Sequence, residues 1–295
     1  MNFEPFPCSQ TLRGLVASGT LLLLATGLAG SAFVLPFGGS AFALAVLATG
    51  VLATCAYLLY RTLIGLTLSY WVDRNGVTVA WWFVRYVIPM THIQQIILGA
   101  PDRGPGPWWT WPSRYVAMLN SGFHAPVLSL ATRPLPEQLL LVTPDGMVGL
   151  SPADPQGFLA ALQERFRLGP TRQLTPGWRL PRIAHSSVWR DRLGLSLLAL
   201  GLLGALALLG WLSVAYSGLP EQLPLHFDAQ GIADRIGPRS GLLVLPIIAL
   251  LTWAVNGLWG GWAYPRQPAS AYLLWAGTLI VQILVGIALA ELMVL

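Results

Sequence analysis

The chain has 295 residues, of which 55% are hydrophobic and only 10% are charged, and its net charge is +5. Soluble domains carry about 25% charged residues, so this composition excludes an ordinary soluble globular protein. The two cysteines, Cys8 and Cys55, give no basis for a disulfide framework or a zinc site.

The first long stretch, residues 14–60, contains no Asp, Glu, Lys or Arg. A bilayer core is ~30 Å thick, and about 20 apolar residues of helix span it. This stretch is therefore long enough to cross twice, with a tight turn at residues 36–40. Because lipid offers no hydrogen-bond partner to the backbone, the spans should be helical. The sequence predicts a multi-pass α-helical membrane protein with five transmembrane helices, at residues 14–35, 41–60, 193–216, 241–264 and 269–290.

Arginine placement predicts the orientation of these helices. The second helix is expected to continue to about Leu66, because an arginine such as Arg61 near a helix end can reach the interface. Five arginines then flank the helices on one side: Arg13, Arg61, Arg190, Arg192 and Arg266. The positive-inside rule places the N-terminus and residues 66–191 in the cytoplasm and the C-terminus outside. The expected location is the inner membrane of a bacterial cell.

The segment 67–169 is expected to form an inserted cytoplasmic β-rich domain. Asn75-Gly76 and Asp145-Gly146 are typical of hairpin turns, and the runs around them are rich in β-branched and aromatic residues. The predicted strands are 68–73, 77–83, 85–88, 93–98, 115–119, 127–131, 138–142 and 147–150.

One amphipathic helix is predicted to close this domain. Asp154-Pro155 supplies a capping residue followed by proline at the first helical position, and Gly169-Pro170 ends the helix. Its apolar face, with Phe158, Leu162 and Phe166, should be buried. The chain thus divides into a tail at 1–13, two helices at 14–66, the β-rich domain at 67–169, a basic linker at 170–190 and three helices at 191–295, with an outer loop at 217–240.

About 100 residues, from "LSYWVDRNGVTVAWWFVRYVIPMTHIQQIIL" to "LSPADPQGFLAALQERF", resemble the bacterial pleckstrin-homology-like (PH-like) domains that are fused to membrane helices. The matching features are a first strand led by Tyr70, a glycine turn, Ile88-Pro89 before the next strand, and Asp154-Pro155 opening the last helix. The resemblance implies seven strands capped by a C-terminal helix. It also implies a binding or assembly module rather than a catalyst.

A second resemblance covers residues 219–240, "LPEQLPLHFDAQGIADRIGPRS". This stretch is similar to a membrane-associated domain of unknown function that also occurs in immunity proteins against a sporulation-linked peptide toxin. The matching positions are Pro220, Pro224, His226, Phe227, Gly231 and Asp234. The chain departs from the pattern at Asp228, where members often have Asn, and at Arg239, where they often have Lys.

The outer loop holds the residues best suited to metal binding. His226, Asp228 and Asp234 offer imidazole and carboxylate ligands, although their spacing matches no well-known metal motif. The alternative is that His226 and Asp234 hydrogen-bond a compact loop between two helices. No phosphate-binding loop, dinucleotide motif or zinc-protease motif is present in the sequence. We therefore expect no enzyme activity, no catalytic residue and no cofactor.

Two features are candidate interaction surfaces. The Gly/Pro-rich segment 99–113 carries Trp108, Trp109 and Trp111, a residue type enriched at membrane interfaces and in binding hot spots. These rings are expected to contact lipid or protein, or alternatively to complete the core of the β-rich domain. A basic cluster that could attract anionic lipid includes Arg179, Arg182, Arg190 and Arg192.

These features favour a non-enzymatic integral membrane assembly protein, or an accessory subunit of a larger membrane complex, whose PH-like domain contacts protein or lipid. Its expected partners are membrane lipid and other membrane subunits or further copies of itself, not nucleic acid. The alternative is a sensor or immunity-type protein that binds a peptide or ligand at the His226 loop. A transporter is disfavoured, since the polar Asn256 and Gln282 are expected to make interhelical hydrogen bonds.

Overall fold

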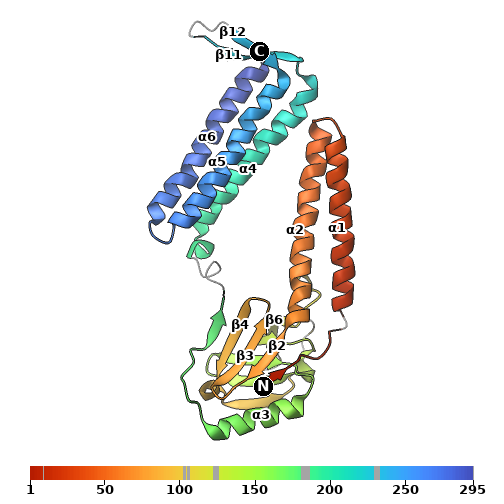
Figure 1. Cartoon of the computed structure of the whole chain (residues 1–295), viewed down its shortest axis with the longest axis vertical. Helices are drawn as coiled ribbons and strands as arrows, with labels where there is room; N and C mark the ends of the chain where they lie inside the picture. Colours follow the sequence, from red (N-terminus) through yellow and green to blue (C-terminus); the bar gives the residue numbers. More distant parts are fainter. Residues whose placement is uncertain are drawn as a thin grey trace. The chain divides into compact units, whose positions relative to one another are not determined.

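The computed structural model describes residues 1–8, 10–101, 104, 107–121, 126–180, 187–228 and 233–294. Five helices in this part of the chain are long and apolar enough to cross a membrane, so the protein is a multi-pass membrane protein, as predicted. They are α1 (Thr11–Val34), α2 (Gly39–Thr67), α4 (Arg192–Ala215), α5 (Val244–Ala263) and α6 (Pro268–Val294), and a β-rich region lies between α2 and α4 (Figure 1).

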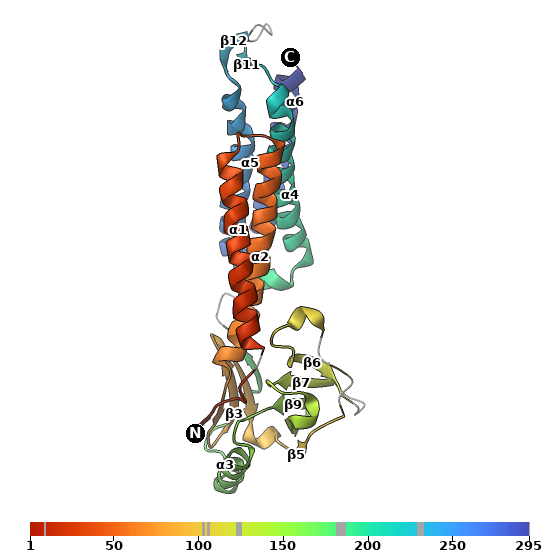
Figure 2. The same cartoon turned by 90° about the vertical axis from the view of Figure 1, so that its right-hand side faces the viewer.

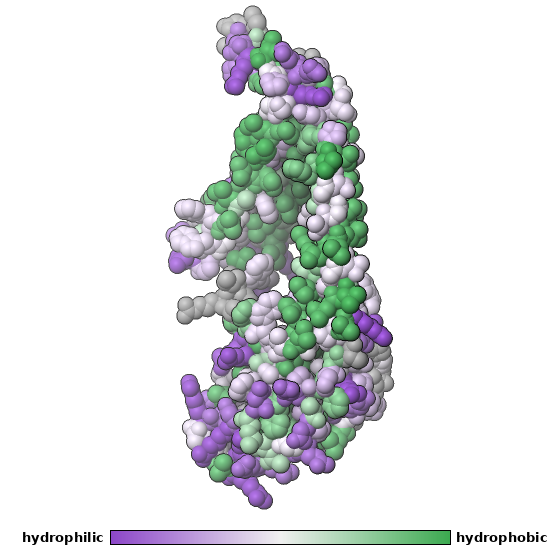
Figure 3. Space-filling view, turned by 45° about the vertical axis from the view of Figure 1, so that its right-hand side comes forward, coloured by the Kyte–Doolittle hydropathy of each residue, from purple (hydrophilic) through white to green (hydrophobic). Residues whose placement is uncertain are grey.

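The chain folds as two compact units, Met1–Ala25 with Gly50–Pro181 and Thr26–Thr49 with Arg182–Leu295. Hydrophobic side chains cover the surface of the long helices, whereas hydrophilic ones gather over the β-rich region and over the segment between α4 and α5 (Figure 3). This division of the surface is the one expected for helices in lipid with water-exposed insertions.

The first sheet of the β domain is antiparallel, in the order β1-β2-β3-β4-β10. Its central strands are β2 (Ser69–Val72), β3 (Gly76–Trp81) and β4 (Val84–Pro89). The predicted turn is present: the Asp73 carboxylate accepts hydrogen bonds from the backbone N–H groups of Asn75 and Gly76. A side chain at Gly76 would collide with the Ile88 carbonyl oxygen, so the close approach of β3 and β4 requires glycine.

Both edges of this sheet are occupied by segments that the sequence placed outside the domain. The N-terminal tail supplies β1 (Asn2–Phe3), which pairs with β2. The predicted linker supplies β10 (Gly177–Arg179), which pairs with β4. The β domain therefore includes more of the chain than residues 67–169.

The second sheet runs in the order β5-β8-β9-β7-β6, and only its β7–β9 pair is parallel. Its strands are β5 (Gln95–Leu98), β6 (Val116–Asn120), β7 (Pro126–Leu130), β8 (Leu139–Thr143) and β9 (Gly146–Leu150). Together, β2 to β9 correspond to the eight strands predicted from the sequence. Short 3-10 turns connect them at Met90–His92 (η1), Trp108–Thr110 (η2) and Leu135–Glu137 (η3).

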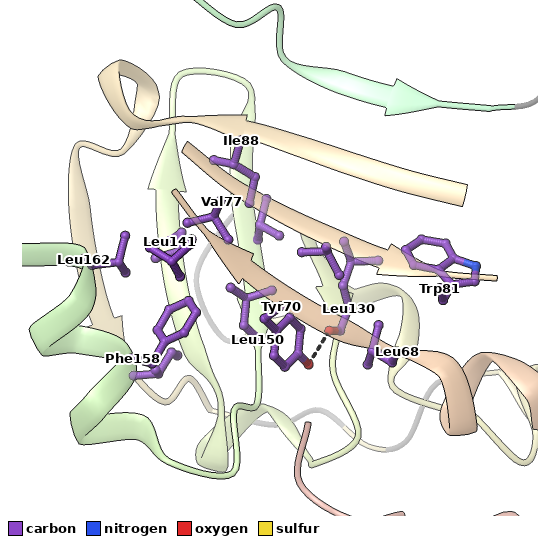
Figure 4. Packing of buried hydrophobic residues seen from close by; sticks show 14 of the residues in the cluster. Leu68, Tyr70, Val77, Trp81, Ile88, Leu130, Leu141, Leu150, Phe158 and Leu162 are labelled. Atoms are coloured by element: carbon purple, nitrogen blue, oxygen red, sulfur yellow. Dashed lines mark hydrogen bonds between the residues drawn. The ribbon is translucent and has the colours of Figure 1, made fainter. Parts of the chain in front are cut away.

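Helix α3 (Pro155–Leu168) lies against the two sheets, as Figure 2 shows. The Asp154 carboxylate caps it by accepting a hydrogen bond from the Gly157 N–H at 2.9 Å. Phe158 and Leu162 point from α3 into a core that includes Tyr70, Leu141 and Leu150, and the Tyr70 hydroxyl donates to the Leu130 carbonyl oxygen (Figure 4).

The prediction that Phe166 is buried was wrong, because 61% of it is exposed. An α-helix has 3.6 residues per turn, so each step of four residues turns the side chain by about 40°. Two steps from Phe158 therefore carry Phe166 off the buried face.

Helices α4, α5 and α6 pack together through glycines and polar side chains. Asn256 on α5 donates to the Thr278 hydroxyl on α6 at 3.1 Å, and Gln282 on α6 donates to the Gly201 carbonyl on α4 at 2.6 Å. These interhelical hydrogen bonds confirm the prediction for both side chains. Gly260 lies directly against the Trp275 ring, so no larger residue fits there.

The segment between α4 and α5, which the sequence predicted only as an outer loop, has regular structure. It forms a hairpin of β11 (Gln222–Phe227) and β12 (Ala233–Pro238). Leu223 at its base packs into a buried cluster with Leu212, Leu242 and Leu289, which attaches the hairpin to the helices.

Candidate functional site

The tryptophan loop, residues 107–113, combines exposed rings with a fixed backbone. Trp108 is 78% exposed and Trp109 is 55% exposed, and Trp111 is half-buried. The Trp108 and Trp109 rings meet edge to face at 5.8 Å. Trp108 and Trp109 are thus largely outside the core, and Trp111 is the most covered of the three rings.

Arg61 of α2 holds this loop in place. Its guanidinium makes four hydrogen bonds, two to the Thr110 carbonyl at 2.8 and 3.1 Å, one to Ser113 at 2.6 Å and one to Val116 at 3.2 Å. The Ser113 hydroxyl donates back to the Arg61 carbonyl at 2.7 Å, and the Tyr57 hydroxyl donates to the Trp109 carbonyl at 3.0 Å.

The sequence suggested that the Arg61 side chain reaches out to the membrane interface. In the structure it is instead buried against the tryptophan loop, and only 9% of the residue is exposed. All four of its hydrogen bonds go to backbone carbonyl oxygens. Hydrogen bonds from a charged donor are stronger than neutral ones, so Arg61 firmly holds the backbone of the tryptophan loop.

A second exposed aromatic pair lies beside the same end of α2. Trp82 and Phe83 form the turn between β3 and β4, and both are exposed. The Trp82 ring lies 6.3 Å from the Tyr60 ring of α2, and the backbone N–H of Trp82 donates to the Thr67 hydroxyl at 3.1 Å. We call Trp82, Phe83, Trp108 and Trp109 the aromatic belt.

Trp82 has a backbone φ of 44°, in the left-handed region that a bulky side chain rarely adopts. Such strain commonly marks functional positions. The sequence pattern predicted a strand at residues 77–83 and gave no sign of this exposed pair. The available signal was three consecutive large aromatics, Trp81 to Phe83, of which only one can face the core of a strand.

The basic residues proposed to attract lipid do not belong to one unit. Arg179 is exposed on β10 in the first unit, whereas Arg190 and Arg192 are exposed at the start of α4 in the second. Arg182 lies outside the described residues.

Between the two arginines, Asp191 caps α4 by accepting from the Leu193 N–H at 3.0 Å. The Tyr272 hydroxyl also donates to Asp191 at 2.6 Å, and this hydrogen bond holds the pKa of the carboxyl below its ordinary value. Asp191 thereby joins the start of α4 to α6, a contact that was not predicted from the sequence.

On the β11–β12 hairpin, the structure brings together one pair of the candidate metal ligands. The His226 Nδ1 atom lies 2.7 Å from the Asp234 carboxylate. Both side chains are exposed. Within the described part of the chain, no three His, Cys, Asp or Glu side chains gather into a group that could hold a metal ion.

Two other positions of the family pattern, Pro224 and Phe227, are paired residues of the hairpin strands. Pro224 pairs with Ile236 and Phe227 with Ala233, whereas Gly231 lies outside the described residues. In the sequence, Arg239 stands out only as a departure from the family pattern. Its guanidinium donates to the Tyr216 and Leu219 carbonyls and lies over the Tyr216 ring, so it fixes the base of the hairpin to the end of α4.

Residues 202–250 match the model of a family described as a domain of unknown function, DUF1648. The match runs from within α4 through the hairpin into α5, and it agrees with the resemblance to such a domain seen in the sequence. A protein of Archaeoglobus fulgidus, described only as uncharacterized, is 47% identical over 64 residues, which are 21% of this chain and 34% of that protein. The chain thus spans about a third of the length of this relative. No solved structure matches the chain.

Proposed function

We propose that this protein is a non-enzymatic membrane assembly protein or accessory subunit, whose β domain is seated on the bilayer surface and contacts protein or lipid. The observation that carries the proposal is the aromatic belt. Four large rings are exposed beside one helix end, and Trp108 and Trp109 are exposed although Arg61 fixes the backbone that bears them.

The length of α2 supports a position of the belt at the membrane interface. Its 29 residues extend about 43 Å at ~1.5 Å per residue, whereas a hydrocarbon core is ~30 Å thick. If Gly39 marks one boundary, the other falls near Tyr57 to Arg61, where the tryptophan loop is attached. Tryptophan and tyrosine are enriched at this depth because their rings are apolar with one polar atom.

Burial of apolar surface also favours docking of the tryptophan loop at the membrane interface. A tryptophan ring can bury 150–250 Å², at roughly 25 cal/mol per Å² of apolar area. Even partial burial of Trp108 and Trp109 therefore favours docking by several kcal/mol. Ordering a flexible loop would oppose docking. Arg61 and Tyr57 already order this one, so much of that cost is met before docking.

We propose a PH-like fold for the β domain, supported by its two sheets and the single helix α3 that closes them. The family resemblance implies seven strands, whereas β1 to β10 give ten in the described residues. Removing the edge strands β1 and β10 leaves eight. The parallel β7–β9 pair is the feature that departs most from a simple antiparallel meander.

We further propose that the β domain is cytoplasmic, that the chain lies in the cell membrane of a bacterium, and that the C-terminus is outside. The support is the placement of Arg13, Arg61, Arg190, Arg192 and Arg266. An alkaline phosphatase fusion at the C-terminus should be active, and a fluorescent-protein fusion at the N-terminus should fluoresce. The opposite pattern would reverse the topology.

Membrane contact of the aromatic belt is tested by replacing both Trp108 and Trp109 with Ser. The full-length native and variant proteins are placed in vesicles whose lipids are brominated near the headgroup, because bromine quenches nearby tryptophan fluorescence. Native protein should lose more tryptophan fluorescence to the bromines than the double variant does. The control is Met118→Ser, an exposed apolar residue on β6. Equal quenching in native and doubly substituted protein would refute membrane seating. For the assembly role, purification in mild detergent followed by mass spectrometry should recover a stoichiometric partner chain or a second copy.

The exposed His226–Asp234 pair supports a second candidate function, a sensor or immunity-type protein that binds a peptide at the hairpin. Replacing His226 with Gln should then abolish the response to that peptide without changing the recovery of partner chains.

A further inference from the structure

A groove of about 510 Å³ lies between α3 and the segment that runs from η1 into β5. Apolar side chains line both sides, with Ile93 and Ile96 on one and Leu162 and Phe166 on the other. The polar side chains in the lining are Gln94, Gln95, Gln163 and Arg167. The exposure of Phe166 is explained by this groove, because the ring forms part of a wall rather than of the core.

One wall of the groove is an open sheet edge. In the described residues β5 pairs only with β8, as the first strand of its sheet. The Gly99 N–H donates to the carbonyl of Gln138, the residue before β8, and Ile97 of β5 is aligned with Leu140 of β8. Alternate residues of an antiparallel strand face opposite edges, so the N–H and C=O groups of Ile96 and Leu98 face away from β8.

In the first sheet, a comparable edge strand, β4, is covered by a short additional strand. There β10, only three residues long, pairs with β4. Its Trp178 ring packs 5.5 Å from Trp81 and 4.7 Å from Tyr86. A short extended segment with one large apolar side chain is thus enough to cover an edge of this domain. At β5 the same kind of edge lies next to an apolar groove, and none of the described strands covers it.

The positive charge of Arg167 in the groove lining indicates which kind of segment can bind there. Arg167 is exposed and has no ion-pair partner among the described residues, so it is available to a carboxylate. Extended peptides commonly bind by adding a strand to a sheet edge, with backbone hydrogen bonds giving affinity and alternate side-chain pockets giving specificity.

We propose that this groove binds an extended acidic segment of a partner protein, which adds to β5 as a further strand. Its alternate apolar side chains would lie against Ile93, Ile96 and Phe166, and a carboxylate would pair with Arg167. This inference rests on the proposed assembly role and names its partner class, at a surface distinct from the aromatic belt.

The test uses the full chain in lipid nanodiscs and, as probe, a displayed library of random ten-residue peptides. Enriched peptides should carry apolar residues at alternate positions and an Asp or Glu. Phe166→Ser and Arg167→Glu should each weaken their binding at least tenfold. The matched controls Leu168→Ser and Arg172→Glu, exposed positions outside the groove, should bind as the native chain does.

Hydrogen exchange reports whether a strand is added. Binding should slow exchange of the Ile96 and Leu98 amides at least tenfold. The proposal fails if no peptides are enriched, if Phe166→Ser and Arg167→Glu bind as the native chain does, or if these amides stay unprotected. It also fails if the chain dimerises through β5, because the occupant is then a second copy. The Trp108→Ser/Trp109→Ser variant should bind the peptides normally, so failure of membrane seating and failure of the groove are distinguishable.

Discussion

The β domain and the β11–β12 hairpin are both β structures inserted between apolar helices, but they hold their polar side chains in opposite ways. At the β domain, Arg61 of α2 is 9% exposed and makes four hydrogen bonds to carbonyl oxygens of that domain. On the hairpin, the His226 side chain is 66% exposed and meets Asp234 through a single contact. Buried polar groups are costly to leave unpaired, whereas exposed pairs contribute about 0–1 kcal/mol. The hairpin motif is more conspicuous in the sequence, yet Arg61 should matter more to the fold.

The largest expected effect is in the core of the β domain. Phe158→Ala should lower the free energy of unfolding by about 3–5 kcal/mol, because the ring is fully buried among Phe3, Tyr70 and the strands. Phe166→Ala on the same helix is the control and should change it by less than about 0.5 kcal/mol, as an exposed position. Equal effects of the two changes, measured by thermal unfolding, would show that α3 does not close this core.

Arg61 gives the next largest effect. Arg61→Met keeps the length and apolar character of α2 but leaves the Thr110, Ser113 and Val116 carbonyls without this donor. We expect a loss of about 3 kcal/mol, in line with the loss of hydrogen bonds to a charged group. Protease cleavage within residues 107–113 should become faster, and membrane insertion should be unchanged. Arg13→Met, an exposed position on α1, is the control. An uncut loop in Arg61→Met would show that other contacts hold it.

The sequence predicted what depends on local pattern and missed what depends on distant partners. The five helices and the eight strands β2 to β9 follow from apolar length, alternation and turn residues. The sequence did not reveal that Arg61 binds backbone carbonyls, because these acceptors lie 49 to 55 positions further along the chain. The edge strands β1 and β10 have two and three residues, too short for any periodicity, and form only because β2 and β4 offer open edges.

The candidate sites follow the same rule. The sequence singled out Trp108 and Trp109 by composition, and both are exposed. It missed Trp82 and Phe83, whose position beside Tyr60 depends on how β3 and β4 return to α2. The hairpin was also missed, because Pro224 within β11 removes a backbone donor and disfavours strand assignment. In a two-stranded hairpin every strand is an edge, so proline is tolerated there.

The pH dependence of stability tests how strongly the β domain buries the polar Tyr70 hydroxyl. Burial raises the pKa of this phenol from its ordinary value to about 12, and its hydroxyl also receives the Ser151 N–H. The folded state therefore retains a proton that the unfolded chain loses near pH 10. This stabilisation is complete below pH 10 and is lost as the pH rises toward 12. We expect a loss of roughly 2–3 kcal/mol over that range, since each pKa unit corresponds to ~1.4 kcal/mol.

The matched variant is Tyr70→Phe. It should be less stable than native protein by about 1–3 kcal/mol at pH 8, since the buried Leu130 carbonyl and Ser151 N–H lose their partner. Its stability should then fall less steeply between pH 10 and 12. Denaturant titrations at both pH values measure the difference. Parallel losses in both proteins would mean that Tyr70 does not titrate differently on folding.

The smallest expected effect is on the hairpin. Asp234→Asn removes the negative charge beside His226 but keeps the shape of the side chain. Because both side chains are exposed, we expect a change in the free energy of unfolding below about 1 kcal/mol. Raising the salt concentration should shrink even that difference, since exposed pairs are screened. The reference change is Arg239→Met, which should cost more because its guanidinium fixes the Tyr216 and Leu219 carbonyls and lies on an aromatic ring. A loss above about 2 kcal/mol in Asp234→Asn, insensitive to salt, would mean that the His226–Asp234 pair is buried in the native assembly. The hairpin would then be an interface, and its polar groups would resemble those of the β domain.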